Sequence, residues 1–90
     1  MNADLPSATA IEATLRERLD PTWIEVVDES ADHAGHAGSN GLGRGTHFRV
    51  RIACPRFAAL SRVACHRLVY DALQPFIDEG LHALAIEIRR

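Results

Sequence analysis

The sequence of 90 residues has no apolar run near the roughly 20 residues that a membrane-spanning helix needs. Its start, Met1 to Asp4, is acidic and lacks the basic and then apolar order of a secretory signal peptide. These two absences predict a protein that does not associate with membranes. We expect it to remain in the cytoplasm, the compartment in which it is made.

Cysteine is scarce as well. The two cysteines, Cys54 and Cys65, lie far apart, so the sequence lacks the Cys-x-x-Cys spacing of zinc knuckles and dithiol redox pairs. We expect both thiols to be small, buried, apolar side chains in a reducing compartment.

The sequence also has no excess of basic over acidic residues. Ten basic residues stand against twelve acidic ones, for a formal charge of −2, which disfavours non-specific binding to nucleic acid. No Ser-His-acid or Cys-His signature and no pair of flanking carboxylates suggests catalysis. The composition therefore favours a binding module over an enzyme.

The length of the chain limits the architecture. At 47% hydrophobic residues, 90 residues are enough for one small core, so we predict a single domain over residues 1–90. Residues 1–8 are expected to form a flexible N-terminal segment.

The first helix is predicted from a capping box and an apolar stripe. Thr9 is followed three residues later by Glu12, a spacing in which each side chain accepts a backbone N–H of the helix start. The stripe recurs every four residues, at Ile11, Leu15 and Leu19. The helix should end at Asp20, because the residue before a proline avoids helical geometry.

Two strands are expected next. Residues 23–29 are β-branched and aromatic, and residues 47–52 alternate with a period of two. The alternation directs Phe48, Val50 and Ile52 to the core, and it leaves Arg49 and Arg51 exposed on the other face.

A longer second helix is predicted after Pro55, with Ser61 as its cap. Pro75 should break it and leave a short extra turn that reaches Glu79. Residues 84–88 then alternate as a last strand. The order α-β-β-α-β predicts an α+β fold, with a three-stranded mixed sheet and both helices packed on one face. The predicted core comprises Ile11, Leu15, Phe48, Val50, Ile52, Leu68, Leu84 and Ile86.

Residues 31–45, between the first two strands, hold five of the six glycines. A hairpin needs two to five residues, so a connection of this length is typical of a functional or unstructured segment. Its Gly35-His-Ala-Gly38 matches the GxxG of RNA-binding KH domains, but that motif joins two helices and this one joins two strands. We therefore do not favour a KH-type RNA clamp.

Histidine is the remaining candidate for site chemistry. Two of the five histidines, His33 and His36, lie in the glycine-rich segment, and the others are His47, His66 and His82. Their spacing alone leaves open whether they are scattered surface residues or metal ligands.

Three ordered motifs resemble the BolA family. They are Glu25-Val-Val-Asp-Glu-Ser30 with Thr46-His-Phe48 after the histidine-bearing segment, His66-Arg-Leu-Val-Tyr70, and Leu81-His-Ala-Leu-Ala-Ile86. The resemblance runs from about Ile11 to Ile88 and implies a class II KH-like α-β-β-α-β fold, the order that the patterning gives.

The resemblance also implies a function. Members of the family pair with a monothiol glutaredoxin as a heterodimer, and the two proteins share a [2Fe–2S] cluster with glutathione. By motif position the metal ligands contributed here would be His33 and His82, with His36 as an alternative to His33. Such a protein would be an adaptor, not an enzyme, in iron–sulfur cluster trafficking or in iron and redox regulation.

The second helix carries a further set of candidate residues. Arg62, His66, Arg67 and Tyr70 are interpreted as partner-contact or structural residues. The same surface, with Arg49 and Arg51, supports the alternative of a nucleic-acid-binding transcriptional regulator that uses the KH-like fold. Against it stand the negative net charge and Cys65, which replaces an arginine usual in the family.

Overall fold

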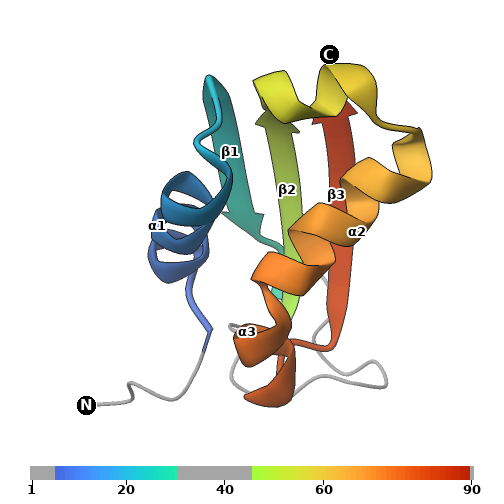
Figure 1. Cartoon of the computed structure of the whole chain (residues 1–90). Helices are drawn as coiled ribbons and strands as arrows, with labels where there is room; N and C mark the ends of the chain where they lie inside the picture. Colours follow the sequence, from blue (N-terminus) through green and yellow to red (C-terminus); the bar gives the residue numbers. More distant parts are fainter. Residues whose placement is uncertain (1–5, 31–45, 90) are drawn as a thin grey trace.

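The computed structural model describes residues 6–30 and 46–89, and it shows helices packed over a sheet (Figure 1). The elements are, in chain order, α1 (Ala8–Leu19), β1 (Trp23–Asp28), β2 (His47–Ala53), the 3-10 helix η2 (Pro55–Ala59), α2 (Arg62–Ala72), α3 (Gln74–Asp78) and β3 (Ala83–Arg89).

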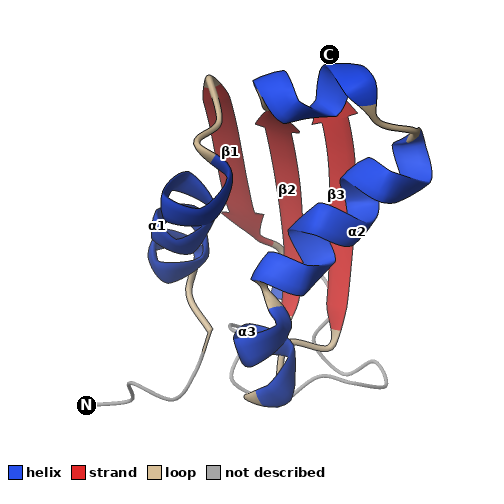
Figure 2. Cartoon of the chain, in the orientation of Figure 1, coloured by secondary structure: helices blue, strands red, loops and turns tan. Residues whose placement is uncertain are grey.

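The sheet has the order β1-β2-β3, with β1 antiparallel and β3 parallel to the central strand β2. Helix α1 packs on β1, α2 packs on β3, and the two helices contact each other, so both cover the same face (Figure 2). The predicted α+β fold, with its three-stranded mixed sheet and helices on one face, is confirmed.

The core lies between that sheet face and the helices. Of the predicted core residues, five are fully buried: Ile11, Leu15, Phe48, Val50 and Ile52. The other three, Leu68, Leu84 and Ile86, are only half-buried, which corrects the prediction. They belong to α2 and to β3, and β3 is an edge strand with a neighbour on one side only. A domain of this size has too little material to cover its edges.

Helix α1 begins earlier than the capping box predicted. The N-cap is Ser7, not Thr9: Ser7 has extended backbone angles, and its Oγ accepts the Ala10 N–H at 3.1 Å. Glu12 instead forms an ion pair with Arg16, one turn further on, at 2.9 Å. The predicted flexible segment 1–8 thus overlaps the helix start, while residues 1–5 lie outside the described part of the chain.

The other helix ends agree with the sequence. Helix α1 stops at Leu19, and Asp20 adopts a left-handed conformation with φ of 50° before the proline. Ser61 caps α2, since its Oγ accepts the Ala64 N–H at 3.1 Å. The helix breaks at Leu73, and α3 supplies the extra turn before Glu79.

Both cysteines are buried and reduced, as predicted. The Sγ of Cys54 contacts the Leu19 carbonyl at 3.0 Å, and that of Cys65 contacts the Phe57 carbonyl at 3.8 Å. Phe57 lies in η2, which the sequence did not predict, and its ring is fully buried in the core. The Cys54 thiol therefore joins the end of α1 to the end of β2, and the Cys65 thiol joins η2 to α2.

Among the helices of residues 6–30 and 46–89, none combines the length and the hydropathy that crossing a bilayer requires.

Candidate functional site

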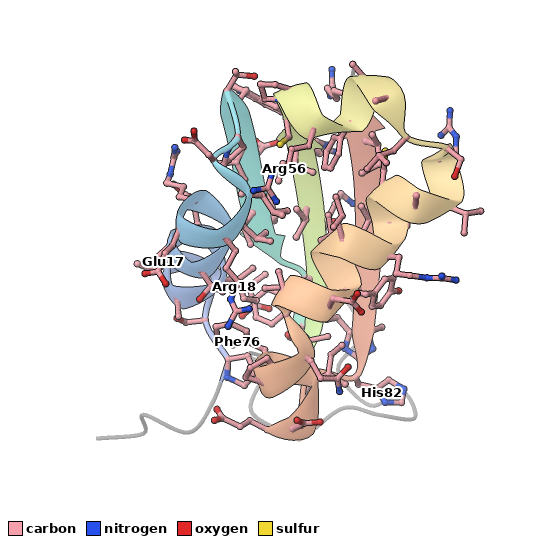
Figure 3. All side chains as sticks on the ribbon, in the orientation of Figure 1. Glu17, Arg18, Arg56, Phe76 and His82 are labelled. Carbon is pink, nitrogen blue, oxygen red and sulfur yellow. The ribbon has the colours of Figure 1, made fainter. Side chains whose placement is uncertain are left out.

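The imidazole of His82 is exposed at the end of the sheet where β3 begins. Figure 3 shows it at the edge of the domain, pointing away from the core. The backbone at this point is fixed, because the carbonyl of Thr46 accepts the N–H of both His82, at 2.7 Å, and Ala83, at 3.0 Å. An exposed side chain thus stands on a rigid base.

The turn before β3 explains why His82 faces outward. Gly80 has a φ of 124°, a conformation that side chains with a Cβ rarely adopt, and it redirects the chain after α3. Leu81 follows and is buried, with its N–H bonded to the Phe76 carbonyl at 3.1 Å. With Leu81 anchored in the core, the next side chain emerges on the surface.

The two residues that flank segment 31–45 lie at the same end of the sheet. Ser30 is buried, and its Oγ accepts the N–H of Thr46 at 2.9 Å and of His47 at 3.0 Å. Thr46 in turn holds the backbone of His82. The residues on either side of the segment that carries His33 and His36 are therefore linked through Thr46 to the His82 backbone. The two histidines themselves lie outside the described residues, so their assignment as ligands stays a prediction.

A second histidine, His47, lies next to His82. The ring centroids are 5.5 Å apart and the rings are tilted by 53°. His47 is the first residue of β2 and is only 7% exposed, and its Nδ1 is 2.8 Å from the Thr46 Oγ1. Sequence patterning counted His47 among the histidines but gave it no role at the site.

The predicted surface on α2 has two parts with different roles. Tyr70 is structural in part, because its hydroxyl donates to the Leu84 carbonyl of β3 at 3.1 Å. Arg62 and His66 flank the exposed Val63 in a shallow hollow, and Arg67 lines a neighbouring one. Within the described chain, no hydrogen bond or ring contact joins these α2 residues to His82.

The uncovered face of the sheet carries a network of charged side chains. Arg49 pairs with Glu29 at 2.9 Å and with Glu87 at 2.8 Å, and Arg51 pairs with Glu25 at 2.8 Å and with Glu87 at 3.2 Å. Both arginine side chains are half-buried, which corrects the prediction that they are exposed.

These pairs shift the ionisation of their members. Hydrogen bonds from Arg49 and Arg51 hold the pKa of Glu87 below its ordinary value. Hydrogen bonds to the glutamates, Glu29 first for Arg49 and Glu25 first for Arg51, raise the pKa of each guanidinium. The two guanidinium groups are balanced by three carboxylates, so this face offers little positive charge to bind the phosphate backbone of a nucleic acid.

The described residues provide an exposed donor at this end of the sheet and not an enclosed metal site. In residues 6–30 and 46–89, no three or more His, Cys, Asp and Glu side chains cluster as a metal site would require. His82 offers an exposed imidazole on a fixed backbone, which suits a ligand to a metal that another molecule also holds.

Known proteins resemble this chain in sequence. Residues 15–90 match the family model described as BolA-like protein. The chain is 50% identical over 78 residues to an uncharacterized protein in the cobS 5′ region of Sinorhizobium, an alignment that covers 86% of this chain and 83% of that one. It is 48% identical over 79 residues to SufE-like protein 1 of Arabidopsis thaliana and 40% identical over 84 residues to BolA-like protein 1 of mouse.

These relatives differ in length. The alignments cover 84% and 93% of this chain, but 21% of the Arabidopsis SufE-like protein and 58% of the mouse protein. The chain therefore corresponds to only part of each of those two proteins.

Solved structures share the fold. The BolA domain of SufE1 from Arabidopsis thaliana superposes with a TM-score of 0.80 at 42% identity, over 94% of this chain and 93% of that one. BolA1 from the same plant also gives a TM-score of 0.80, at 39% identity over 93% and 90% of the two chains. Sequence and structure agree that this chain belongs to the BolA-like family.

Proposed function

We propose that this chain is a cytoplasmic adaptor, not an enzyme, that pairs with a monothiol glutaredoxin. The two proteins and glutathione would hold one [2Fe–2S] cluster between them. The observation that carries the proposal is the placement of His82, whose exposed imidazole stands on a backbone held by two hydrogen bonds to Thr46. A ligand in this position can reach a metal held by a docked partner without rearrangement of the sheet.

The types of ligand suit a cluster that two proteins share. Thiolates of the glutaredoxin and of glutathione would bind one iron, and two imidazoles of this chain would bind the other. Imidazole ligands in place of thiolates raise the reduction potential of such a cluster. Protonation of the ring nitrogen also releases an imidazole from iron, so the bond can be broken without a change of oxidation state. Both properties favour a protein that passes a cluster on or reports iron status.

His33 is proposed as the second ligand, with His36 as its alternative. Both belong to segment 31–45, whose flanking residues Ser30 and Thr46 lie at the end of the sheet that carries His82. Thr46 bonds the His82 backbone directly and Ser30 bonds Thr46, which supports a ligand pair drawn from the segment and from the residue before β3.

The experiment is co-purification with a monothiol glutaredoxin, glutathione and iron, followed by absorption and circular dichroism spectra. We expect a heterodimer whose spectrum differs from that of the glutaredoxin homodimer, since nitrogen replaces sulfur at one iron. His82→Ala should abolish the difference, whereas His66→Ala on α2 should retain it. His33→Ala should destabilise the cluster more than His36→Ala does. A wild-type spectrum from His82→Ala would refute the ligand assignment.

The alternative of a nucleic-acid-binding regulator gains no support from the charged face. Arg49 and Arg51, which that interpretation adds to the α2 surface, are already paired with three glutamates. A DNA titration would show a steep loss of affinity with salt if several phosphates were contacted. We expect only weak binding without sequence preference.

A further inference from the structure

The ring of His47 packs beside the ring of His82 at a centroid distance of 5.5 Å. This spacing falls within the range of about 4.5–7 Å at which planar rings interact favourably in tilted arrangements. His47 is the first residue of β2, and His82 directly precedes the neighbouring parallel strand β3, whose first residue, Ala83, is in register with His47. The contact thus depends on the sheet and not on local sequence.

His47 is held in place by its own contacts. Its side chain is buried, its backbone N–H donates to the Ser30 Oγ at 3.0 Å, and its carbonyl accepts the Glu29 N–H at 2.7 Å. Its ring Nδ1 lies 2.8 Å from the hydroxyl of the buried Thr46. The imidazole of His47 therefore has a fixed position and a fixed orientation.

The side chain of His82 is held differently. Its backbone is anchored to Thr46, but its ring is exposed and forms no hydrogen bond within the described part of the chain. Without a packed neighbour, an exposed ring on a fixed backbone would sample several staggered rotamers, and ordering it on ligand binding would cost side-chain entropy. A rigid neighbour that favours one rotamer would remove much of that cost in advance.

We propose that His47 is a positioning residue, which holds the His82 imidazole in the orientation in which it meets iron. The inference rests on the proposed function, because it gives His82 the role of a ligand. Thr46 acts at both levels: its carbonyl fixes the His82 backbone, and its hydroxyl fixes the ring that packs against the His82 side chain. Residues around a ligating histidine commonly orient its ring in metal sites, most often through a hydrogen bond.

Three variants separate the parts of this arrangement. His47→Ala removes the packed ring, whereas His47→Phe retains a ring and loses the bond to Thr46. Thr46→Val removes the hydroxyl, but it retains the side-chain volume and the carbonyl that holds the His82 backbone.

The first measurement uses the free protein, with no cluster and no partner. NMR of histidine-labelled protein should show one predominant χ1 rotamer for His82 and cross-relaxation between the two rings. His47→Ala should give averaged χ1 couplings, His47→Phe should restore the single rotamer, and Thr46→Val should fall between them. Amide spectra establish that each variant is folded. The positioning role is wrong if His82 keeps a single χ1 rotamer in His47→Ala. It is also wrong if the χ1 couplings of His82 are already averaged in the wild type.

The second measurement uses the heterodimer with the glutaredoxin. Removing a supporting residue of a metal ligand typically weakens binding about 10–100-fold, so a chelator should remove the cluster from His47→Ala at least about tenfold faster than from wild type. His47→Phe should recover most of this loss. If His82→Ala abolishes the heterodimer spectrum but His47→Ala releases the cluster at the wild-type rate, the positioning role fails and the proposed function stands. If His82→Ala leaves the spectrum unchanged, the proposed function fails whatever the NMR shows.

Discussion

Two valines on the same helix provide a matched test of the packing described above. Val69 and Val63 both lie in α2, but Val69 is 0% exposed in the core and Val63 is 68% exposed. Replacing each with alanine removes the same two methyl groups from the same type of backbone. The intrinsic helix preference for alanine is at most about 0.7 kcal/mol and favours both variants, so it is small beside the difference expected from burial.

The difference between the two variants follows from burial. Each buried methyl group contributes about 0.8 kcal/mol, and the space left behind adds a cavity penalty, so Val69→Ala should lose about 2 kcal/mol of unfolding free energy. Val63→Ala should be neutral within about 0.5 kcal/mol. For a domain with about 5–15 kcal/mol in total, the first loss is large and the second is negligible.

Urea unfolding followed by far-ultraviolet circular dichroism measures both values, and equal m-values would show that the comparison is valid. In thermal unfolding, the loss at Val69 corresponds to a decrease in Tm of about 10 °C. The packing of α2 on the sheet would be wrong if Val63→Ala were destabilised as much as Val69→Ala.

The remaining predictions concern caps, an edge contact and pH. Ser7→Ala should destabilise the protein by about 1 kcal/mol in urea unfolding, whereas Thr9→Ala should have little effect. The reverse order would show that Thr9, and not Ser7, caps α1. Tyr70→Phe should lose about 0.5–1.5 kcal/mol with its hydrogen bond to β3, and an unchanged unfolding midpoint would show that the bond contributes nothing. Because the pKa of Glu87 is lowered from 4.5, its contribution to stability is present above that pH and is lost as the pH falls through the lowered value. The stability difference between wild type and Glu87→Gln should therefore shrink below about pH 4.5 in a series of unfolding curves, and a constant difference would contradict the pairing.

Patterning in the sequence was sufficient for the topology. The alternation over β2, the stripe of α1 and the break near Pro75 each reflect a local constraint that the fold retains. The exact start of α1 and the short 3-10 helix were not predicted, because neighbouring residues can form alternative local structures. Ser7 and Thr9 can both cap a helix, and the pairing of Glu12 with Arg16 removes the advantage that the capping box gave to Thr9. Short 3-10 helices such as η2 leave only a weak local signal.

Only part of the candidate site was predicted, because a sequence motif identifies single residues and not contacts between distant ones. The motif resemblance identified His82, and the structure shows how the buried Leu81 and the Thr46 carbonyl present it. The role of His47 could not be inferred, because its contact with His82 arises from the parallel pairing of β2 with β3, between residues far apart in sequence. The pairing of Arg49 and Arg51 with three glutamates likewise depends on strands that meet only in the folded sheet.

The central claim is that histidine nitrogen from this chain binds iron in a complex with a monothiol glutaredoxin. The most direct test labels only this chain with ¹⁵N-histidine, forms the heterodimer with unlabelled glutaredoxin, glutathione and iron, and reduces the cluster. Pulsed electron paramagnetic resonance should then show ¹⁵N couplings from two imidazoles, and His82→Ala should remove one of them. A reduced cluster in the heterodimer without any ¹⁵N coupling would contradict the account.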